Sequence, residues 1–572
     1  MICSLKCLST KSGKSILLIL EKKTYVFNIF EGFQRYCIEA NISLKFITTV
    51  FIPNREGIPP LCGLYLTLRD MNVNSLNIVC SEDVENLIKK AFSFCPPNSL
   101  KILFIRDFYD DEFITVTDQY ILQIKKFRGK FKIENIPENI PKKFYKELVL
   151  GKKITVEGQT YEGSDFLEPS INFKKIFILY NGKLKIEEGS KVLCLRMSDY
   201  KRLKSEDTWY VCGSAGIDFV SQYNLLRGLR DISKDYHLPR LLKQRQKIRR
   251  TRQVNKKLTY DILEPCRFFK YLQSTDCFTY KKEALGFVLN RGVRNVPLVN
   301  YQDSDNFLTT DENFALILGS GCAIPSKYRN VTGIFVFIEN KGFLLDCGED
   351  TVNQLLRLKG SQCLLDSLDV IFISHSHGDH NLGLINLLAK LNHKVILIAP
   401  QCIIDFVSSF CENVVTFATN KAKELEYEHG VSSFNFPDDL EINVCGCVHN
   451  LDSCSVSIKY KNVKFSYSGD TRPSELFACM AFNSDLMIHE STFEDDNLDK
   501  ALKTKHSTLG EAYYIFKKSQ SKELLLTHFS QRYSKNFMAN NLGIPCHDFY
   551  KYRIGKSEYK DKDINEYLKN LQ

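Results

Sequence analysis

Three histidines and one aspartate crowd into six positions of the segment FISHSHGDHNLGL (372–384), in a chain with eleven histidines among 572 residues. Zinc prefers neutral imidazole and carboxylate ligands, and a His-x-His pair on a loop after a strand can turn both rings toward one ion. His375 and His377 form such a pair. Asp379 and His380 follow closely enough to face a neighbouring ion. The loop therefore predicts a two-metal site.

Further ligand types stand singly after predicted strands in the same half of the chain. His449 follows the run EINVCGCV, Asp470 follows VKFSYSG, and His528 follows ELLLT. A carboxylate between two metal ions about 3.5–4 Å apart can help to hold a water that is nucleophilic near neutral pH. Asp470 is our candidate for that bridge.

Glu490 and His506 are predicted to act in catalysis and not as ligands. Glu490 follows an apolar run in MIHESTF, and His506 in KTKHSTLGEA comes just before a predicted helix. A capping or core role is the alternative for each. HEST is not HExxH, so a helical metalloprotease site is excluded. The remaining histidines match no ligand pattern and are predicted to be surface or core residues: His237, His393, His429, His489 and His547.

These residues need a scaffold, and an internal repeat indicates which one. Both halves contain a β run, a turn with glutamate, an amphipathic helix, a second apolar strand and a Gly-Leu that begins another helix. Glu31 and Gly63 frame the first copy, and Glu349 and Gly383 frame the second. The first copy has PNREGIPP where the second has its histidines, so metal chemistry belongs to the second half only.

Length and composition agree with two soluble globular domains. The chain has 572 residues, 44% hydrophobic and 25% charged, which exceeds one ordinary core. No apolar run reaches the roughly 18 residues that span a bilayer. We predict a first domain at 1–235, a basic connector at 236–305 and a second domain at 306–572.

Cysteine and charge patterns add three expectations. The twenty cysteines are scattered and are predicted to be reduced thiols, with CGC (445–447) in a strand and not at a metal. The net charge is +10, and residues 239–257 carry nine basic residues and no acidic one. That segment suits phosphate backbones or a nuclear import receptor, with a solvated linker helix as the alternative. The N-terminal segment is predicted to be a β-hairpin, and it leaves a mitochondrial address open.

Seven motifs together resemble one family. GSGCAIPSKYRN, LLDCGEDT, HSHGDHNLGL, SGDTRP, HESTF, KHST and HFSQRY resemble ribonuclease Z, the tRNA 3′-end endonuclease of the metallo-β-lactamase superfamily. The match covers about 230 residues of the second half. A duplicated chain with a ligand-free first copy looks like the eukaryotic long form. The resemblance implies an α/β fold of two tandem metallo-β-lactamase-like αββα sandwich domains, the N-terminal copy degenerate and the C-terminal copy catalytic.

The resemblance also implies roles for individual residues. Asp379 would help to activate the attacking water, and Glu490 with His506 would protonate the leaving oxygen. Two zinc ions would be bound, one by His375, His377, His449 and Asp470, and the other by Asp379, His380, Asp470 and His528.

Two further segments resemble parts of the family that contact RNA. PSKYRN (325–330) matches a loop that senses the tRNA 3′ end, which implies substrate binding by Pro325, Lys327, Arg329 and Asn330. Residues 130–170 are similar to an arm that clamps the tRNA elbow. Asp350 departs from the family, because GEDT stands here where GEGT is usual, and an altered glycine turn is expected.

The expected function is removal of the 3′ trailer from precursor tRNA after the discriminator nucleotide, leaving a 3′-hydroxyl on the tRNA and a 5′-phosphate on the trailer. Precursor tRNA is the expected partner, with no membrane. A monomer is expected, because the duplication mimics a dimer. The basic stretch favours the nucleus, the cytoplasm is also open, and long forms also serve mitochondria.

Three alternatives remain at this point. A thioesterase of the same superfold would share the histidine loop, but has no use for a duplicated half or for PSKYRN. A nuclease of the mRNA 3′-end type would need a large domain inserted in the lactamase unit, and the spacing from His380 to His449 is short. A catalytically decayed tRNA-binding scaffold would have lost at least one ligand.

Overall fold

The structure is a computed structural model of residues 1–572. It describes residues 3–9, 13–20, 23–39, 42–92, 100–106, 108–117, 121–125, 135–137, 139–149, 152–166, 176–179, 191–194, 209–212, 260–262, 270–272, 277–281, 286–290, 312–326, 328–356, 358, 361–419, 431–533 and 542–555. The basic stretch 239–257, Lys327, His237 and His429 lie outside these residues.

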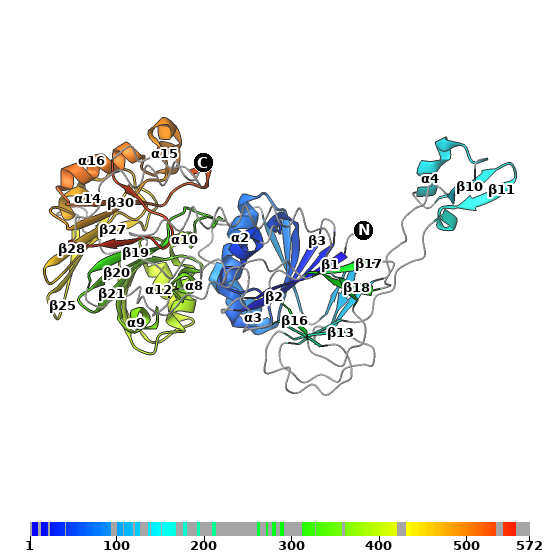
Figure 1. The fold of residues 1–572 in the computed structure, drawn as a ribbon, viewed down its shortest axis with the longest axis horizontal. Helices are drawn as coiled ribbons and strands as arrows, with labels where there is room; N and C mark the ends of the chain where they lie inside the picture. Colours follow the sequence, from blue (N-terminus) through cyan, green and yellow to red (C-terminus); the bar gives the residue numbers. More distant parts are fainter. Residues whose placement is uncertain are drawn as a thin grey trace.

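The C-terminal half is a sandwich of two seven-stranded sheets (Figure 1). Its first sheet has the order β24-β23-β22-β21-β20-β19-β32 and its second β25-β26-β27-β28-β29-β30-β31. The strands of the first sheet are β19 (Phe314–Gly319), β20 (Gly333–Ile338), β21 (Lys341–Cys347), β22 (Leu368–Phe372), β23 (Val395–Ala399), β24 (Val414–Ala418) and β32 (Lys551–Arg553). Those of the second are β25 (Val431–Phe436), β26 (Leu440–Gly446), β27 (Cys454–Tyr460), β28 (Val463–Tyr467), β29 (Leu486–Glu490), β30 (Leu524–Thr527) and β31 (Ile544–Pro545).

Apolar side chains fill three layers of this half. Ile317, Phe343 and Ile458 belong to the core between the two sheets. Strands buried on both faces, such as GIFVFI in β20, are apolar at every position, as is usual for the centre of a covered sheet. Helices α8 (Thr351–Leu356), α9 (Ser361–Asp366), α11 (Leu384–Leu388) and α12 (Gln401–Ser408) cover the first sheet, and α14 (Glu475–Met480) and α16 (Leu509–Ser519) cover the second. The predicted αββα sandwich is confirmed for this half.

The N-terminal half repeats this architecture. Its larger sheet has the order β15-β18-β17-β1-β2-β3-β4-β5-β6, and its smaller one β16-β14-β13-β12-β9-β8-β7. The larger sheet contains β1 (Cys3–Ser9), β2 (Lys14–Leu20), β3 (Lys23–Phe27), β4 (Ile47–Phe51), β5 (Ser75–Val79), β6 (Lys101–Ile105), β15 (Tyr260–Ile262), β17 (Cys277–Lys281) and β18 (Gly286–Asn290). The smaller contains β7 (Tyr109–Asp110), β8 (Ile114–Val116), β9 (Ile121–Ile124), β12 (Ile176–Leu179), β13 (Lys191–Cys194), β14 (Trp209–Cys212) and β16 (Lys270–Leu272).

The pairing of strands bears out the predicted repeat. β3, β4, β5 and β6 pair in parallel, as β21, β22, β23 and β24 do. The predicted N-terminal hairpin is also confirmed, since β1 pairs antiparallel with β2. β17 pairs antiparallel with β1, although its residues fall in the predicted connector 236–305. The N-terminal half therefore extends past 235, because strands near 260–290 complete its sheets.

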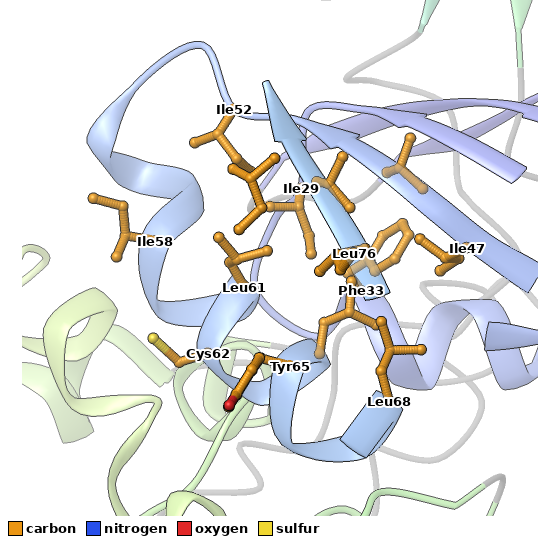
Figure 2. Close-up of a cluster of buried hydrophobic side chains, with 14 of the residues drawn as sticks. Ile29, Phe33, Ile47, Ile52, Ile58, Leu61, Cys62, Tyr65, Leu68 and Leu76 are labelled. Atoms are coloured by element: carbon orange, nitrogen blue, oxygen red, sulfur yellow. The ribbon is translucent and has the colours of Figure 1, made fainter. Parts of the chain in front are cut away.

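Helices of the N-terminal half pack against the C-terminal half. Figure 2 shows the core between the larger sheet and α2 (Ile58–Asp70), with Phe33 of α1 (Phe33–Glu39), Leu61 and Leu68 directed into it. This half also contains α3 (Glu82–Ala91). The same cluster includes Leu382 and Phe406 of the C-terminal half, both at least nine-tenths buried. The two halves therefore share one apolar core at α2 and at the residues that follow α10 (Gly378–Asn381).

Reciprocal hydrogen bonds join equivalent positions of the two copies. The amide of Asp350 donates to Glu31 Oε1 at 2.9 Å, and the amide of Gly32 donates to Glu349 Oε1 at 3.0 Å. Gln34 Nε2 also donates to Glu349, at 2.7 Å. Burial raises the pKa of Glu349 to about 8 and that of Glu31 well above its usual range. Such an exchange is what a two-fold symmetric dimer interface contains.

The structure explains why aspartate fits at position 350, where the family pattern has glycine. The φ of Asp350 is +70°, a left-handed conformation that glycine adopts without cost and that aspartate tolerates better than most residues. Its Oδ1 accepts a hydrogen bond from Asn353 Nδ2 at 2.8 Å. A β-carbon at the facing Gly32 would lie 2.4 Å from that Oδ1. The turn thus keeps the left-handed conformation, and Gly32 makes room for the longer side chain.

A small module projects from the N-terminal half (Figure 1). It consists of α4 (Tyr145–Val149), β10 (Lys153–Val156) and β11 (Gln159–Glu162). Ile140, Leu148, Ile154 and Phe166 are part of its own apolar core. The module lies within the predicted arm 130–170. No helix among the described residues combines the length and apolarity needed to cross a membrane.

Candidate metal centre

The histidine loop leaves the buried strand β22 and enters α10. β22 pairs in parallel with β21 and β23. The loop after it therefore lies at the carboxyl ends of these strands, where folds of this kind form their sites. His375 and His380 are fully buried. His375 Nε2 and His377 Nδ1 are 2.9 Å apart, so the His-x-His pair does turn both rings toward one point.

The three ligand candidates from other strands lie at the same place. His449, Asp470 and His528 follow β26, β28 and β30 of the second sheet. His449 Nε2 is 3.2 Å from His377 Nδ1. His528 Nε2 is 3.4 Å from Asp379 Oδ2. All seven predicted ligands are thus brought together at the edges of two sheets.

Asp470 stands between two groups of donors. Its carboxylate is 3.6 Å from His375 Nε2 and 3.2 Å from His380 Nε2. It is also 3.3 Å from His528 Nε2. Donor atoms that lie within 4.8 Å of one another form three groups: His375, His377, His449 and Asp470; Asp379, His380 and His528; and Asp470, His506 and His528.

The charge states of His375, His377 and Asp470 suit a divalent cation. Burial would lower the pKa of His380, but Asp470, Asp379 and Asp346 outweigh it and raise that pKa well above its usual range, so His380 would release a proton on binding a cation. Burial lowers the pKa of His375 and of His377, so both rings are neutral at physiological pH. Burial alone would raise the pKa of Asp470, but the adjacent His380 and His528 lower it well below its usual range. Neutral imidazole with ionised carboxylate is a donor set that zinc binds.

Two of the buried side-chain atoms that lack a hydrogen-bond partner within the described part of the chain belong to this site. They are His380 Nε2 and Asp470 Oδ1, and each faces the centre of the site. A buried polar atom without a partner costs about 1–3 kcal/mol. Coordination of a cation would satisfy both atoms, so the residues present fit a metal ion.

Contacts on the far side of the rings fix their orientation. His380 Nδ1 lies 2.7 Å from Asp346 Oδ2, and His449 Nδ1 lies 2.9 Å from the carbonyl of Lys505. An oxygen acceptor keeps the proton on Nδ1 and leaves the Nε2 lone pair for the metal. Hydroxyl groups orient two other rings in the same way. Ser374 Oγ lies beside His375 Nδ1, and Thr492 Oγ1 lies beside His528 Nδ1.

Asp346 is a residue that the sequence analysis did not assign, although it lies in the quoted motif LLDCGEDT. It is fully buried and holds four groups around the site. It accepts hydrogen bonds from the amide and hydroxyl of Ser374, from Tyr467 Oη at 2.7 Å and from His380 Nδ1. Its role depends on contacts with Tyr467 of β28 and with the loop after β22, which lie far away in the sequence. No local sequence pattern reveals such contacts.

Glu490 and His506 form a pair beside the ligands. Glu490 ends β29, and His506 lies between α15 (Leu498–Thr504) and the capping box that begins α16. His506 Nδ1 is 3.0 Å from Glu490 Oε1 and 3.9 Å from Asp470 Oδ2. Burial would lower the pKa of His506, but Glu490 outweighs it and raises that pKa to about 9. The ring is therefore a proton donor at neutral pH.

The predicted substrate loop borders the site. The amide of Ala323 donates to Asp379 Oδ2 at 2.6 Å, which ties the loop to a ligand. Pro325 and Asn330 are buried. Arg329 Nη1 donates to Ser320 Oγ at 2.8 Å and its guanidinium lies over the Phe529 ring. Lys327 lies outside the described residues.

The remaining described histidines make structural contacts. His393 Nε2 is 2.8 Å from the carbonyl of Leu368, and His489 Nδ1 is 2.7 Å from that of Glu490. His547 Nδ1 is 3.2 Å from the carbonyl of Asp548. Cys447 of the CGC segment donates to the Asp470 carbonyl and is not part of a disulfide.

Comparison with known proteins assigns the region that holds the site. Residues 341–529 match the family model described as beta-lactamase superfamily domain. The matched region covers about a third of the chain. It contains all seven ligand candidates together with Glu490 and His506.

The domain and its flanks are similar to ribonucleases Z. Ribonuclease Z 1 of Schizosaccharomyces pombe is 36% identical over 252 residues, 38% of this chain and 31% of that protein. Ribonuclease Z, mitochondrial, of Drosophila melanogaster is 32% identical over 249 residues, 38% of this chain and 32% of that protein. Zinc phosphodiesterase ELAC protein 2 of Mus musculus is 32% identical over 248 residues, 38% of this chain and 30% of that protein. The matches thus span about a third of the length of these relatives.

The whole chain also has a structural counterpart. A long form RNase Z from yeast superposes with a TM-score of 0.69 and 17% identity, and the match covers 100% of both chains. The whole chain therefore shares its fold with that protein. The predicted resemblance to ribonuclease Z is confirmed in sequence similarity and in fold.

Asp346→Asn is expected to weaken zinc binding by about 10- to 100-fold, because outer contacts of ligating histidines contribute that much to affinity. The asparagine keeps the size of the side chain but loses the charge that orients His380. Competition with a chromophoric chelator measures the affinity. Asp366→Asn, at an exposed position on α9, is the control. A competition curve equal to that of the wild type would contradict the role of Asp346.

Proposed function

We propose that this chain is a zinc-dependent endoribonuclease that removes the 3′ trailer from precursor tRNA. It would cut after the discriminator nucleotide and leave a 3′-hydroxyl on the tRNA and a 5′-phosphate on the trailer. The observation that carries the proposal is the Glu490–His506 pair, whose imidazole lies 3.9 Å from Asp470 at the centre of the ligand cluster. Similarity to ribonucleases Z over that cluster supports the choice of RNA.

Two zinc ions are part of the proposal. One would be held by His375, His377, His449 and Asp470, and the other by Asp379, His380, Asp470 and His528. Two donor groups on either side of Asp470 support this count. Zinc supplies Lewis acidity, which lowers the pKa of water and stabilises negative charge on phosphoryl oxygens.

The chain's own residues would perform the proton transfers. Asp379 Oδ2, held by the Ala323 amide, can accept a hydrogen bond from the attacking water and orient it. His506 Nδ1 is held by Glu490, so Nε2 presents its proton to the leaving 3′ oxygen. Thr471 and Thr492 donate to the Glu490 carboxylate at 2.7 and 2.6 Å and fix its position.

The N-terminal half would serve RNA recognition. Its described residues contribute no group of metal ligands. Precursor tRNA is an extended A-form object that proteins contact largely through shape and backbone. Five lysines of the projecting module are exposed and suit phosphate contacts: Lys142, Lys143, Lys146, Lys152 and Lys153.

We also propose that one chain acts as a monomer, since the reciprocal Glu31 and Glu349 contacts supply a dimer-like interface within it. Nuclear localisation through residues 239–257 stays a prediction.

The alternative activities have less support. A nuclease of the mRNA 3′-end type needs an inserted domain, yet the described segments between His380 and His449 belong to the two sheets and their covering helices. A catalytically decayed scaffold would not retain all seven ligand candidates close together. A thioesterase would have no need for a general acid of raised pKa next to the ligands.

His375→Ala is expected to abolish cleavage of a precursor tRNA with a 3′ trailer, because it removes a ligand at the centre of the cluster. Binding of the tRNA should stay within a few-fold of the wild type in a filter-binding assay. His393→Gln is the control, since that ring contacts only a carbonyl in the hydrogen bonds described above. Undiminished cleavage by the purified His375→Ala protein, or hydrolysis of a thioester by the wild type in place of RNA, would refute the proposal.

Glu490→Gln is expected to shift the alkaline limit of RNA cleavage downward. In the wild type His506 holds its proton up to pH about 9, so activity is lost as the pH rises through that value. Without the Glu490 charge the pKa of His506 returns toward about 6.5, so about one ring in a hundred keeps its proton at pH 8.5 and cleavage there falls about 100-fold. Hydrolysis of bis(p-nitrophenyl) phosphate, whose leaving group needs no proton, is the internal control. A pH profile that keeps its alkaline limb near 9 would contradict this role.

Replacement of residues 135–166 by a short Gly-Ser linker is expected to raise KM for precursor tRNA. The module has its own apolar core, so its removal should leave the rest of the fold intact. Hydrolysis of bis(p-nitrophenyl) phosphate should change little. Equal losses on both substrates would count against recognition of RNA by the module.

A further inference from the structure

Asp548 clamps the loop that carries PSKYRN at both of its ends. Its Oδ1 accepts hydrogen bonds from the amide and the hydroxyl of Ser320, at 3.1 and 2.9 Å. Its Oδ2 accepts from the amide of Asn330 at 2.7 Å. Ser320 precedes the loop and Asn330 ends it, so one carboxylate sets the span of residues 321–329.

The clamped loop reaches the metal centre. The amide of Gly321 donates to the carbonyl of Asn330 at 2.8 Å and closes the loop at its base. Ala323 donates to Asp379, one of the ligand candidates. Ser320 Oγ in turn accepts from Arg329 Nη1 at 2.8 Å. A shift of the clamp would therefore move Arg329, which Ser320 holds.

A cation from the other half of the chain stands against this clamp. Arg35 Nη1, in the first turn of α1, lies 3.5 Å from Asp548 Oδ2. The side chains of Arg35 and Asp548 are 1% and 0% exposed. Opposite charges buried to this degree attract each other strongly, because little solvent screens them.

Residues next to Arg35 hold a second anchor of the loop. Asn330 Nδ2 donates to the carbonyl of Glu349 at 2.9 Å. The Glu349 side chain accepts from the Gly32 amide and from Gln34 Nε2. Both anchors of Asn330 are thus contacted by residues 32–35, which belong to the half without metal ligands.

We propose that Arg35 is a positioning residue for the RNA-contacting loop 321–329 and that it acts through Asp548. The inference rests on the proposed function and on the resemblance of PSKYRN to a loop that senses the tRNA 3′ end. It gives the ligand-free half a second role beside RNA contact. That half would hold the substrate loop of the catalytic half in a geometry ready for RNA.

Arg35→Met removes the charge and keeps an unbranched side chain. Because displacement of a positioned group by about 1 Å can cost up to about 10²-fold in rate, kcat/KM for trailer-bearing precursor tRNA is expected to fall about 10- to 100-fold, mainly through KM. Hydrolysis of bis(p-nitrophenyl) phosphate and zinc content should stay within about threefold of the wild type, as expected for a loop that the small substrate does not need. Arg35→Lys keeps the charge and should restore most of the loss. Arg69→Met, on α2 of the same half, is the control.

A double-mutant cycle tests the route of the effect. If Arg35 acts through Asp548, Arg35→Met should add little to the loss caused by Asp548→Asn, since the two residues lie on one path. Independent, multiplicative losses would overturn the inference. So would equal losses on RNA and on bis(p-nitrophenyl) phosphate, because they would indicate a general structural defect.

The remaining outcomes are also decisive. Should Arg35→Met not fold, Arg35→Gln and Asp548→Asn carry the test: a rise in KM for RNA alone supports the inference, and an unchanged KM in both overturns it. A wild-type protein that hydrolyses bis(p-nitrophenyl) phosphate but not precursor tRNA would overturn the proposed function and this inference together. Wild-type cleavage of precursor tRNA with unaltered KM in Arg35→Met overturns the inference alone.

Discussion

Packing seven imidazole and carboxylate groups together at the ends of two sheets creates an electrostatic demand that the rest of the structure serves. His375, His380 and Asp470 are almost completely buried, so solvent cannot balance their lone pairs and charge. Outer acceptors such as Asp346 and the Lys505 carbonyl direct the free ring nitrogens inward. The arrangement is therefore built for a cation, and it explains why so many strand ends converge at one point.

Strained backbone conformations at the site fit the same demand. Ala323, Asp346 and His528 all have positive φ, between 57° and 61°. A non-glycine residue in this region costs about 1–3 kcal/mol and persists where surrounding contacts determine it. Here those contacts are hydrogen bonds around the ligands, such as Ala323 to Asp379. Local conformational stability is thus given up where the position of a donor atom matters.

The duplication lets one chain supply both sides of a symmetric interface while the sides diverge. Glu31 and Glu349 still exchange equivalent hydrogen bonds with the opposite copy. Burial of these carboxylates raises their pKa, so the contact holds protons at neutral pH and behaves largely as a neutral interface. The two copies differ in the loop that could bind metal. The histidines follow β22 in the second copy, and PNREGIPP follows the equivalent strand β4 in the first.

The sequence by itself determined the ligand types, their places after apolar strands, the repeat and the absence of histidines from the first copy's equivalent loop. These features are local, because a strand of buried residues and the loop after it are read from consecutive positions. Only the tertiary structure decided the roles of Asp346 and Asp548 and the approach of Arg35. Arg35 and Asp548 are 513 positions apart, and strand β17 joins β1 across more than 270 positions. Contacts of that kind depend on how sheets and halves pack, and no spacing along the chain encodes them.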